Sequence, residues 1–208
     1  WEISARPIFG HIITIDDLAN RQFDCDLVIN PNFNRTTSDY LGLIATSSKI
    51  LAGPNYALIR QEFSCERDKS ISRKLNITAC RRILLIFGGS NTASIIRQTL
   101  LAIPERVINH VFFDVVIGSA VSKSELLITE FSNNHTITFH EDPNSIAELM
   151  LNADLAISAA GGTVLESFCM GLPSIITSIA ENQDASANWL LKEQLCMHFQ
   201  QLMSILIL

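Results

Sequence analysis

The strongest constraint on the fold is a repeated alternation of short apolar runs and amphipathic stretches between residues 82 and 195. Each apolar run ends in glycine or polar residues, as the buried strands of a parallel sheet do. The expected strands are 82–87, 111–117, 136–140, 155–158 and 174–179. The expected helices are 93–102, 143–152, 163–170 and 184–195, with a helix or an irregular turn over 122–133. Parallel strands joined by crossover helices form an open sheet with helices on both faces. We therefore predict an α/β fold with a Rossmann-like parallel sheet, whose ligands bind at the carboxyl ends of the strands.

The first third of the chain shows a weaker version of the same pattern. Short apolar runs at 12–15, 26–30 and 50–52 end in polar residues or glycine, and the segment 62–80 is polar and charged. We expect residues 1–68 to form a partial, incomplete N-terminal α/β domain with a linker, and residues 69–208 to form the Rossmann-like domain. The abrupt start at Trp1 and the apolar end at Leu208 lead us to expect a fragment of a longer protein.

Composition limits the classes of partner. The net charge of −6 and the lack of a basic stripe argue against a nucleic-acid binder. No apolar run approaches the roughly 18 residues of a membrane span. The five cysteines are widely spaced without a C-x-x-C pair, which favours free thiols in the cytoplasm and predicts no zinc site. We expect a cytoplasmic monomer without metal or cofactor.

A first candidate site, Gly88-Gly89-Ser90-Asn91, lies between an expected strand and an expected helix. Glycines let backbone N–H groups approach an anion, and the helix that follows adds its positive end. The spacing fits neither G-x-G-x-x-G nor a P-loop. A tight turn that needs glycine only for its conformation remains the alternative.

A second candidate combines Gly161, Gly162 and Thr163 with Glu166, again between a strand and a helix. The glycines would expose the helix N-terminus to a phosphate. Glu166 lies one turn further on, where a carboxylate can accept hydrogen bonds from two vicinal ribose hydroxyls. The alternative is a helix-favouring glutamate near the positive end of the helix dipole.

A third candidate, Asn182-Gln183, follows the last expected strand. Amide side chains donate and accept hydrogen bonds together, which suits sugar hydroxyls or an acetamido group. Simple N-capping by Asn182 is the alternative.

Together, these glycine segments, the helix stop at 171–173 and the amide pair resemble the C-terminal domain of MurG-type UDP-sugar glycosyltransferases. Three further segments are similar to one narrower family, the UDP-2,4-diacetamido-2,4,6-trideoxy-β-L-altropyranose hydrolases of pseudaminic acid biosynthesis: 53–63 (GPNYALIRQEF), 15–18 (IDDL) and 26–32 (DLVINPN). The resemblance implies a glycosyltransferase-B-like fold and an inverting UDP-sugar hydrolase, in which water replaces UDP without a metal.

The resemblance also implies roles for the candidate residues. The segments 88–91 and 161–163 would hold the diphosphate, and Glu166 the ribose. The loop around His140 would lie near the uracil, and a binding or capping role for His140 is favoured over a catalytic one. Asn182 and Gln183 would face the sugar.

The catalytic base is left open. The family carries a G-x-G-H-x-x-R loop with the proposed base, and Gly10-His11 does not match it because it precedes the run at 12–15. Asp16 and Asp17 are weak candidates, with turn formation as the alternative. Tyr56 and Arg60 would line the cleft or pack in a hinge. A UDP-sugar glycosyltransferase and a non-catalytic UDP-sugar-binding module are the competing functions.

Overall fold

The computed structural model describes residues 1–88, 92–118 and 124–199, and its chain divides into two units. The first unit contains residues 1–58 and 180–190, and the second contains the remainder. The expected boundary at residue 68 therefore lies inside the second unit. In the described part of the chain, no helix is both long and apolar enough to cross a membrane.

The first unit is built on a small parallel sheet in the order β1-β2-β3. Its elements are α1 (Glu2–Ala5), β1 (Ile13–Ile15), β2 (Leu27–Asn30), the 3-10 turn η1 (Thr37–Tyr40), β3 (Lys49–Ala52), the 3-10 turn η2 (Pro54–Tyr56) and most of α8 (Glu181–Lys192). Phe33 stacks on Trp189 with ring centroids 6.0 Å apart, which joins α8 to this unit. All three expected strands are present.

The second unit is a six-stranded parallel sheet in the order β6-β5-β4-β7-β8-β9. Its strands are β4 (Arg82–Ile86), β5 (Phe112–Ile117), β6 (Ile137–Glu141), β7 (Leu155–Ala159), β8 (Ser174–Thr177) and β9 (Met197–His198). Its helices are α2 (Gln61–Lys74), α3 (Ala93–Ala102), α4 (Glu105–Ile108), α5 (Ser124–Phe131), α6 (Ile146–Asn152) and α7 (Gly162–Cys169). The five strands expected between residues 82 and 179 are confirmed.

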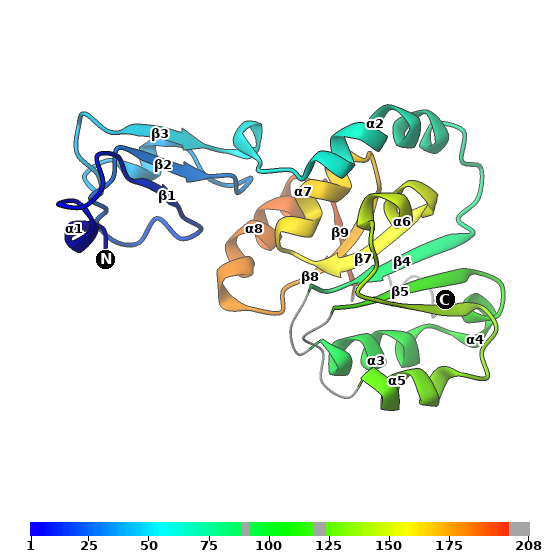
Figure 1. The fold of residues 1–208 in the computed structure, drawn as a ribbon. Coiled ribbons are helices and arrows are strands. Elements are labelled where there is room, and N and C mark those ends of the chain that lie inside the picture. The colour runs from blue at the N-terminus through cyan, green and yellow to red at the C-terminus, as the bar shows by residue number, and fades with distance from the viewer. Residues whose placement is uncertain (89–91, 119–123, 200–208) are drawn as a thin grey trace. The chain divides into compact units, whose positions relative to one another are not determined.

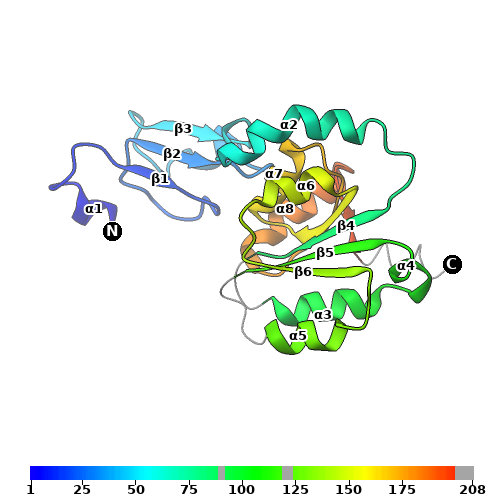
Figure 2. The same cartoon turned by 45° about the vertical axis from the view of Figure 1, so that its right-hand side comes forward.

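Helices cover both faces of this sheet, as Figures 1 and 2 show. Ile96 of α3 and Leu127 of α5 pack on one face, in a core with Leu85 and Val115. On the other face, α2, α6 and α7 pack over a core that includes Phe63 and Met150. The central apolar strands predicted from sequence, such as β4, are therefore buried on both sides, as is typical of parallel sheets.

The expectation of a linker or surface segment over residues 62–80 is wrong in one respect, because most of this segment forms helix α2. The sequence did not indicate this helix because it has few apolar residues. It is held in place largely by hydrogen bonds from its polar side chains to backbone carbonyls. Phe63 is 0 % exposed, and Ser70 Oγ donates to the carbonyl of Met170 at 2.7 Å. Lys74 Nζ donates to the carbonyl of Met150 at 3.0 Å, near the C-terminal end of α6. A lysine at this position also suits the negative end of the α6 dipole.

A smaller correction concerns Pro143, which precedes α6 instead of lying in its first turn. The helix begins at Ile146, and Ser145 is its N-cap, with Oγ accepting from the Glu148 amide at 3.2 Å. A serine side chain can satisfy a free helical N–H, which proline at that position cannot do.

One buried carboxylate holds the start of the central strand. Asp154 accepts from the backbone amides of Arg81 and Arg82 at 2.8 and 2.9 Å, and from Arg73 Nη2 at 2.6 Å. Its side chain is only 5 % exposed. Burial alone would raise the pKa of Asp154, but these hydrogen bonds and the charge of Arg73 outweigh burial and lower it. Asp154 thus joins β4, α2 and the start of β7.

We predict that Asp154→Asn lowers the free energy of unfolding by about 2–3 kcal/mol at pH 7, because buried donors lose a charged acceptor. Urea unfolding measures this loss. Asp68→Asn, at a fully exposed carboxylate 3.8 Å from Arg67, is the matched control and should cost close to nothing.

The pH dependence of this difference provides a second check. Because the folded-state pKa of Asp154 is lowered, its contribution is fully present above the unfolded pKa of about 4 and is lost as pH falls through the folded pKa. The gap between the native protein and Asp154→Asn should therefore narrow in acid. A gap that stays constant down to pH 2 would contradict this role of the charge.

Candidate functional site

The strand order places a crevice at the centre of the second unit. Strands β4 and β7 are neighbours in the sheet, although β5 and β6 lie between them in sequence. The connections from these two strands leave toward opposite faces, which opens a crevice at their carboxyl ends. Gly88 follows β4, and Gly161 and Gly162 follow β7. Gly88, the described residue of the first glycine segment, and Gly162 of the second therefore lie at one place.

A cavity of about 440 Å³ lies at this crevice, and all its lining residues belong to the second unit. Three glycines, Gly88, Gly118 and Gly162, line it. Its charged lining residues are Arg60, Asp142 and Glu166. The cavity thus combines accessible backbone with one cation and two carboxylates, a mixture suited to a polar ligand that carries both an anion and hydroxyl groups.

The glycines at 88 and 162 serve different purposes. Gly88 has φ +93°, in the left-handed region that glycine adopts at least cost. Gly162 opens α7 with no such constraint, and a Cβ there would meet no described atom within 4 Å. The first-turn amides of Gly162 and Thr163 have no acceptor among the described residues. Free N–H groups at a helix start that faces a cavity are suited to an anion.

Glu166 lies one turn deeper in α7 and lines the same cavity. Its side chain is 17 % exposed, and Oε1 accepts from Arg60 Nε at 3.1 Å. Burial raises the pKa of Glu166, while the hydrogen bond and charge of Arg60 oppose part of that rise. A half-buried carboxylate near a helix start is placed to accept hydrogen bonds from a ligand.

His140 does not line this cavity. Its Nε2 lies 2.8 Å from Asp114 Oδ1, and Asp114 Oδ2 accepts from Arg82 Nη1 at 2.8 Å. The imidazole therefore joins β4, β5 and β6 across one face of the sheet. The strand end that His140 fixes leads directly to Asp142, which does line the cavity.

The other expected site residues lie in the first unit. Asp16 Oδ2 accepts from the Tyr40 hydroxyl and from the Ala19 amide, both at 2.7 Å, which supports the turn-forming interpretation. Asp17 Oδ1 is 3.5 Å from the Asn32 side-chain amide. Tyr56 ends η2.

The amide pair also belongs to the first unit, in the first turn of α8. Asn182 is exposed, and the backbone amide of Gln183 donates to the carbonyl of Ala180 at 2.9 Å. Their sugar-binding role stays a prediction. Gly89, Ser90 and Asn91 lie outside the described residues.

Sequence reasoning missed Gly118, Asp142, Pro143 and Ile146 as lining residues. The available signal was positional: Gly118 and Asp142 each follow a predicted strand, at the sheet edge where ligands bind. Asp142 has a left-handed φ of +45°, which turns the chain at the end of β6.

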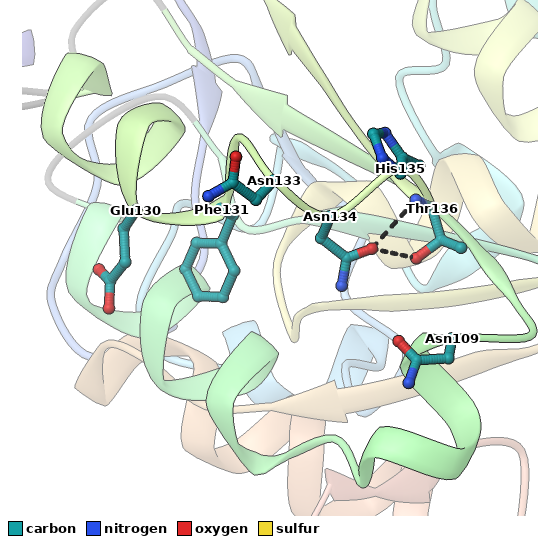
Figure 3. A pocket seen from close by; sticks show the side chains of 7 residues that line it. All are labelled: Asn109, Glu130, Phe131, Asn133, Asn134, His135 and Thr136. Carbon is teal, nitrogen blue, oxygen red and sulfur yellow. Dashed lines mark hydrogen bonds between the residues drawn. The ribbon is translucent and has the colours of Figure 1, made fainter.

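A second polar cavity, of about 470 Å³, lies near the amino ends of strands β5 and β6 (Figure 3). Asn134 Oδ1 accepts from the backbone amide of Thr136 at 3.0 Å and from its hydroxyl at 2.6 Å. Glu130 pairs with Arg97 at 2.7 Å. These groups already serve the local structure, and ligands of such sheets bind at the carboxyl edge. We therefore place the candidate site at the first cavity.

The fold and the cavity define a class of protein, a Rossmann-like domain of glycosyltransferase-B type. The crystal structure of MurG from Acinetobacter baumannii shares the fold with a TM-score of 0.54 at 16 % identity, over 92 % of this chain and 53 % of that one. Residues 83–203 match the model of the glycosyltransferase family 28 C-terminal domain, and the chain belongs to this family. The predicted fold class is confirmed.

Two relatives are similar in sequence. The Bacillus subtilis spore coat polysaccharide biosynthesis protein SpsG is 31 % identical over 68 % of this chain. The UDP-2,4-diacetamido-2,4,6-trideoxy-β-L-altropyranose hydrolase of Campylobacter jejuni is 27 % identical over 88 % of it. The matched regions span 41 % of the first protein and 62 % of the second.

The contrast between the two glycines gives a prediction. Gly88→Ala should lower the free energy of unfolding by about 1–2 kcal/mol, because an L-residue is strained at this φ. Gly162→Ala should cost nothing, because its Cβ enters open space and alanine favours helices. Urea unfolding of both variants measures the difference. Equal losses would mean that residue 162 is constrained by the fold and not kept open for a ligand.

Proposed function

We propose that this chain forms the UDP-binding part of a UDP-sugar hydrolase of surface-glycan biosynthesis, acting on a deoxy diacetamido sugar. One observation carries the proposal: a cavity at the switch point of the sheet places free helix-start amides beside a half-buried carboxylate. A diphosphate fits the amides, and ribose hydroxyls fit Glu166 one helical turn, about 5.4 Å, further on. The hydrolase relative, matched over 88 % of this chain, supports the choice of substrate class.

In this reaction, water forms a bond to the anomeric carbon, and the bond from that carbon to the diphosphate oxygen breaks. UDP leaves with the electron pair, and the proton of the water passes to a base. The residues of the cavity would act on the leaving group. The first-turn amides of α7 face the place where negative charge develops, and fixed dipoles aimed at such charge lower the barrier. Glu166 would hold the nucleoside and so fix the diphosphate on the helix.

The second candidate is a UDP-sugar glycosyltransferase, in which an acceptor hydroxyl replaces the water. The family of the C-terminal domain favours it. Both functions use the same nucleotide contacts. Product analysis separates them: release of free sugar from the UDP-sugar in the absence of any acceptor indicates hydrolysis, and a requirement for an acceptor indicates transfer.

The role of Glu166 gives the most direct prediction. Hydrogen bonds to a charged group are worth about 1.5–3 kcal/mol. Glu166→Ala should therefore weaken UDP binding by about tenfold or more, at about 1.4 kcal/mol per decade. Binding of 2′,3′-dideoxy-UDP, which lacks the hydroxyls, should change much less. Isothermal calorimetry of both ligands measures the two losses, with ADP as the test of base preference.

Glu148→Ala is the matched control, because Glu148 is an exposed glutamate in the first turn of α6 and does not line the cavity. It should leave both affinities unchanged. If Glu166→Ala weakened UDP and its dideoxy analogue alike, Glu166 would act only on the helix, and the ribose contact would be rejected.

A further inference from the structure

Arg60 is fixed on three sides, although its side chain is 55 % exposed. Its Nε donates to Glu166 Oε1 at 3.1 Å, and its Nη1 lies 2.8 Å from Glu62 Oε1. Its guanidinium carbon lies over the ring of Phe63, 4.8 Å from the centroid. Phe63 is completely buried in the core beneath. An arginine bound to two carboxylates and an aromatic face has little freedom to move.

Glu62, the second partner of Arg60, is itself held by helix α6. Its Oε2 accepts from Ser145 Oγ at 2.9 Å and from the Ala147 amide at 3.3 Å. A carboxylate at a helix N-terminus is stabilised by the free amides and the dipole. A continuous chain of contacts therefore leads from the start of α6 through Glu62 and Arg60 to Glu166.

This series of contacts acts on the Glu166 carboxylate. Besides Arg60, the charge of Glu62 acts on Glu166, and Asp142, directly after β6, lines the same cavity; both are carboxylates. Arg60 is the one cation among the described residues that line the cavity. Arg60 donates only to Oε1 of Glu166, and Oε2 of Glu166 has no partner among the described residues. A carboxylate has about four acceptor positions, so most remain open.

We propose that Arg60 is a positioning residue, which holds the Glu166 carboxyl group in one place so that its remaining acceptor positions face the hydroxyl groups of a bound nucleotide. This inference rests on the proposed function. It gives Arg60 a role that acts through Glu166, where the sequence suggested either cleft lining or hinge packing. Without Arg60, Glu166 would be half-buried among carboxylates alone, which favours its protonated form.

The first test needs no ligand. The side-chain carboxyl resonance of Glu166, identified by its loss in Glu166→Gln, is followed by NMR against pH. Burial raises the pKa of Glu166 and Arg60 opposes that rise, so Arg60→Met should move the titration to higher pH. Arg60→Lys should restore part of the native position. Arg67→Met, at an exposed arginine in α2, the helix that Arg60 precedes, is the control and should leave the titration in place.

The second test measures UDP binding across pH by calorimetry. Arg60→Met should weaken UDP about two- to fivefold at pH 7, the effect of one largely exposed ion pair, and by more as pH falls. The affinity should be lost at higher pH than in the native protein, whereas 2′,3′-dideoxy-UDP should bind almost as before. A merely structural role of Arg60 would change neither the pH profile nor the ratio of the two ligands.

Two results would overturn the inference: an unmoved Glu166 titration in Arg60→Met, or equal weakening of UDP and dideoxy-UDP, which would mean that Arg60 contacts another part of the nucleotide directly. Failure of the proposed function has a different signature. In that case native protein would not bind UDP, while the ligand-free titration would still report whether Arg60 holds Glu166.

Discussion

Burial of both faces of the six-stranded sheet is the constraint on which the rest of the second unit depends. Side chains such as Leu84, Leu85 and Val115 are 0 % exposed, so the central strands are buried on both sides and need helices above and below them. Helices on both faces require crossover connections, and those connections diverge at β4 and β7. The crevice between them is therefore a consequence of burial. The helices cover the faces of the sheet and leave the carboxyl ends of the strands open, and the polar groups of the site gather there.

The same constraint explains which parts of the fold could be predicted from sequence. Strands β4 to β8 are short, mostly apolar runs that end in glycine or polar residues, so their positions along the chain could be predicted. Helix α2 was not, because its attachment relies on one aromatic residue and on bonds such as Ser70 to the carbonyl of Met170. Polar side chains that bond to distant backbone look the same in sequence as side chains exposed to water. Only the tertiary structure shows their acceptors.

The residues of the candidate site differ in the same way in how far they could be predicted. Gly88, Gly162 and Glu166 could be predicted because each has a local signature at a strand–helix junction. Their partners could not: Arg60 and Glu166 are 106 positions apart, and no periodicity joins them. His140 shows a second limit, since its position at a strand end suggested a ligand contact, and its Nε2 lies 2.8 Å from Asp114 Oδ1, a pairing that no sequence pattern indicated. The position of a residue at a strand end can be predicted from sequence, but contacts with neighbouring strands determine the direction of its side chain.

The charges of the cavity suggest how a protein with a net charge of −6 can bind an anion. Arg60 is matched by Glu62 and Glu166, so it adds little net positive potential for a diphosphate. The attraction would then come from the start of α7, where free amides and the helix dipole carry about half a positive charge. Such partial charges act over short range and in fixed directions. Recognition would therefore depend on the placement of donors and acceptors within the cavity, with backbone amides binding the anion and Arg60 serving the carboxylate that binds its neighbour, the ribose.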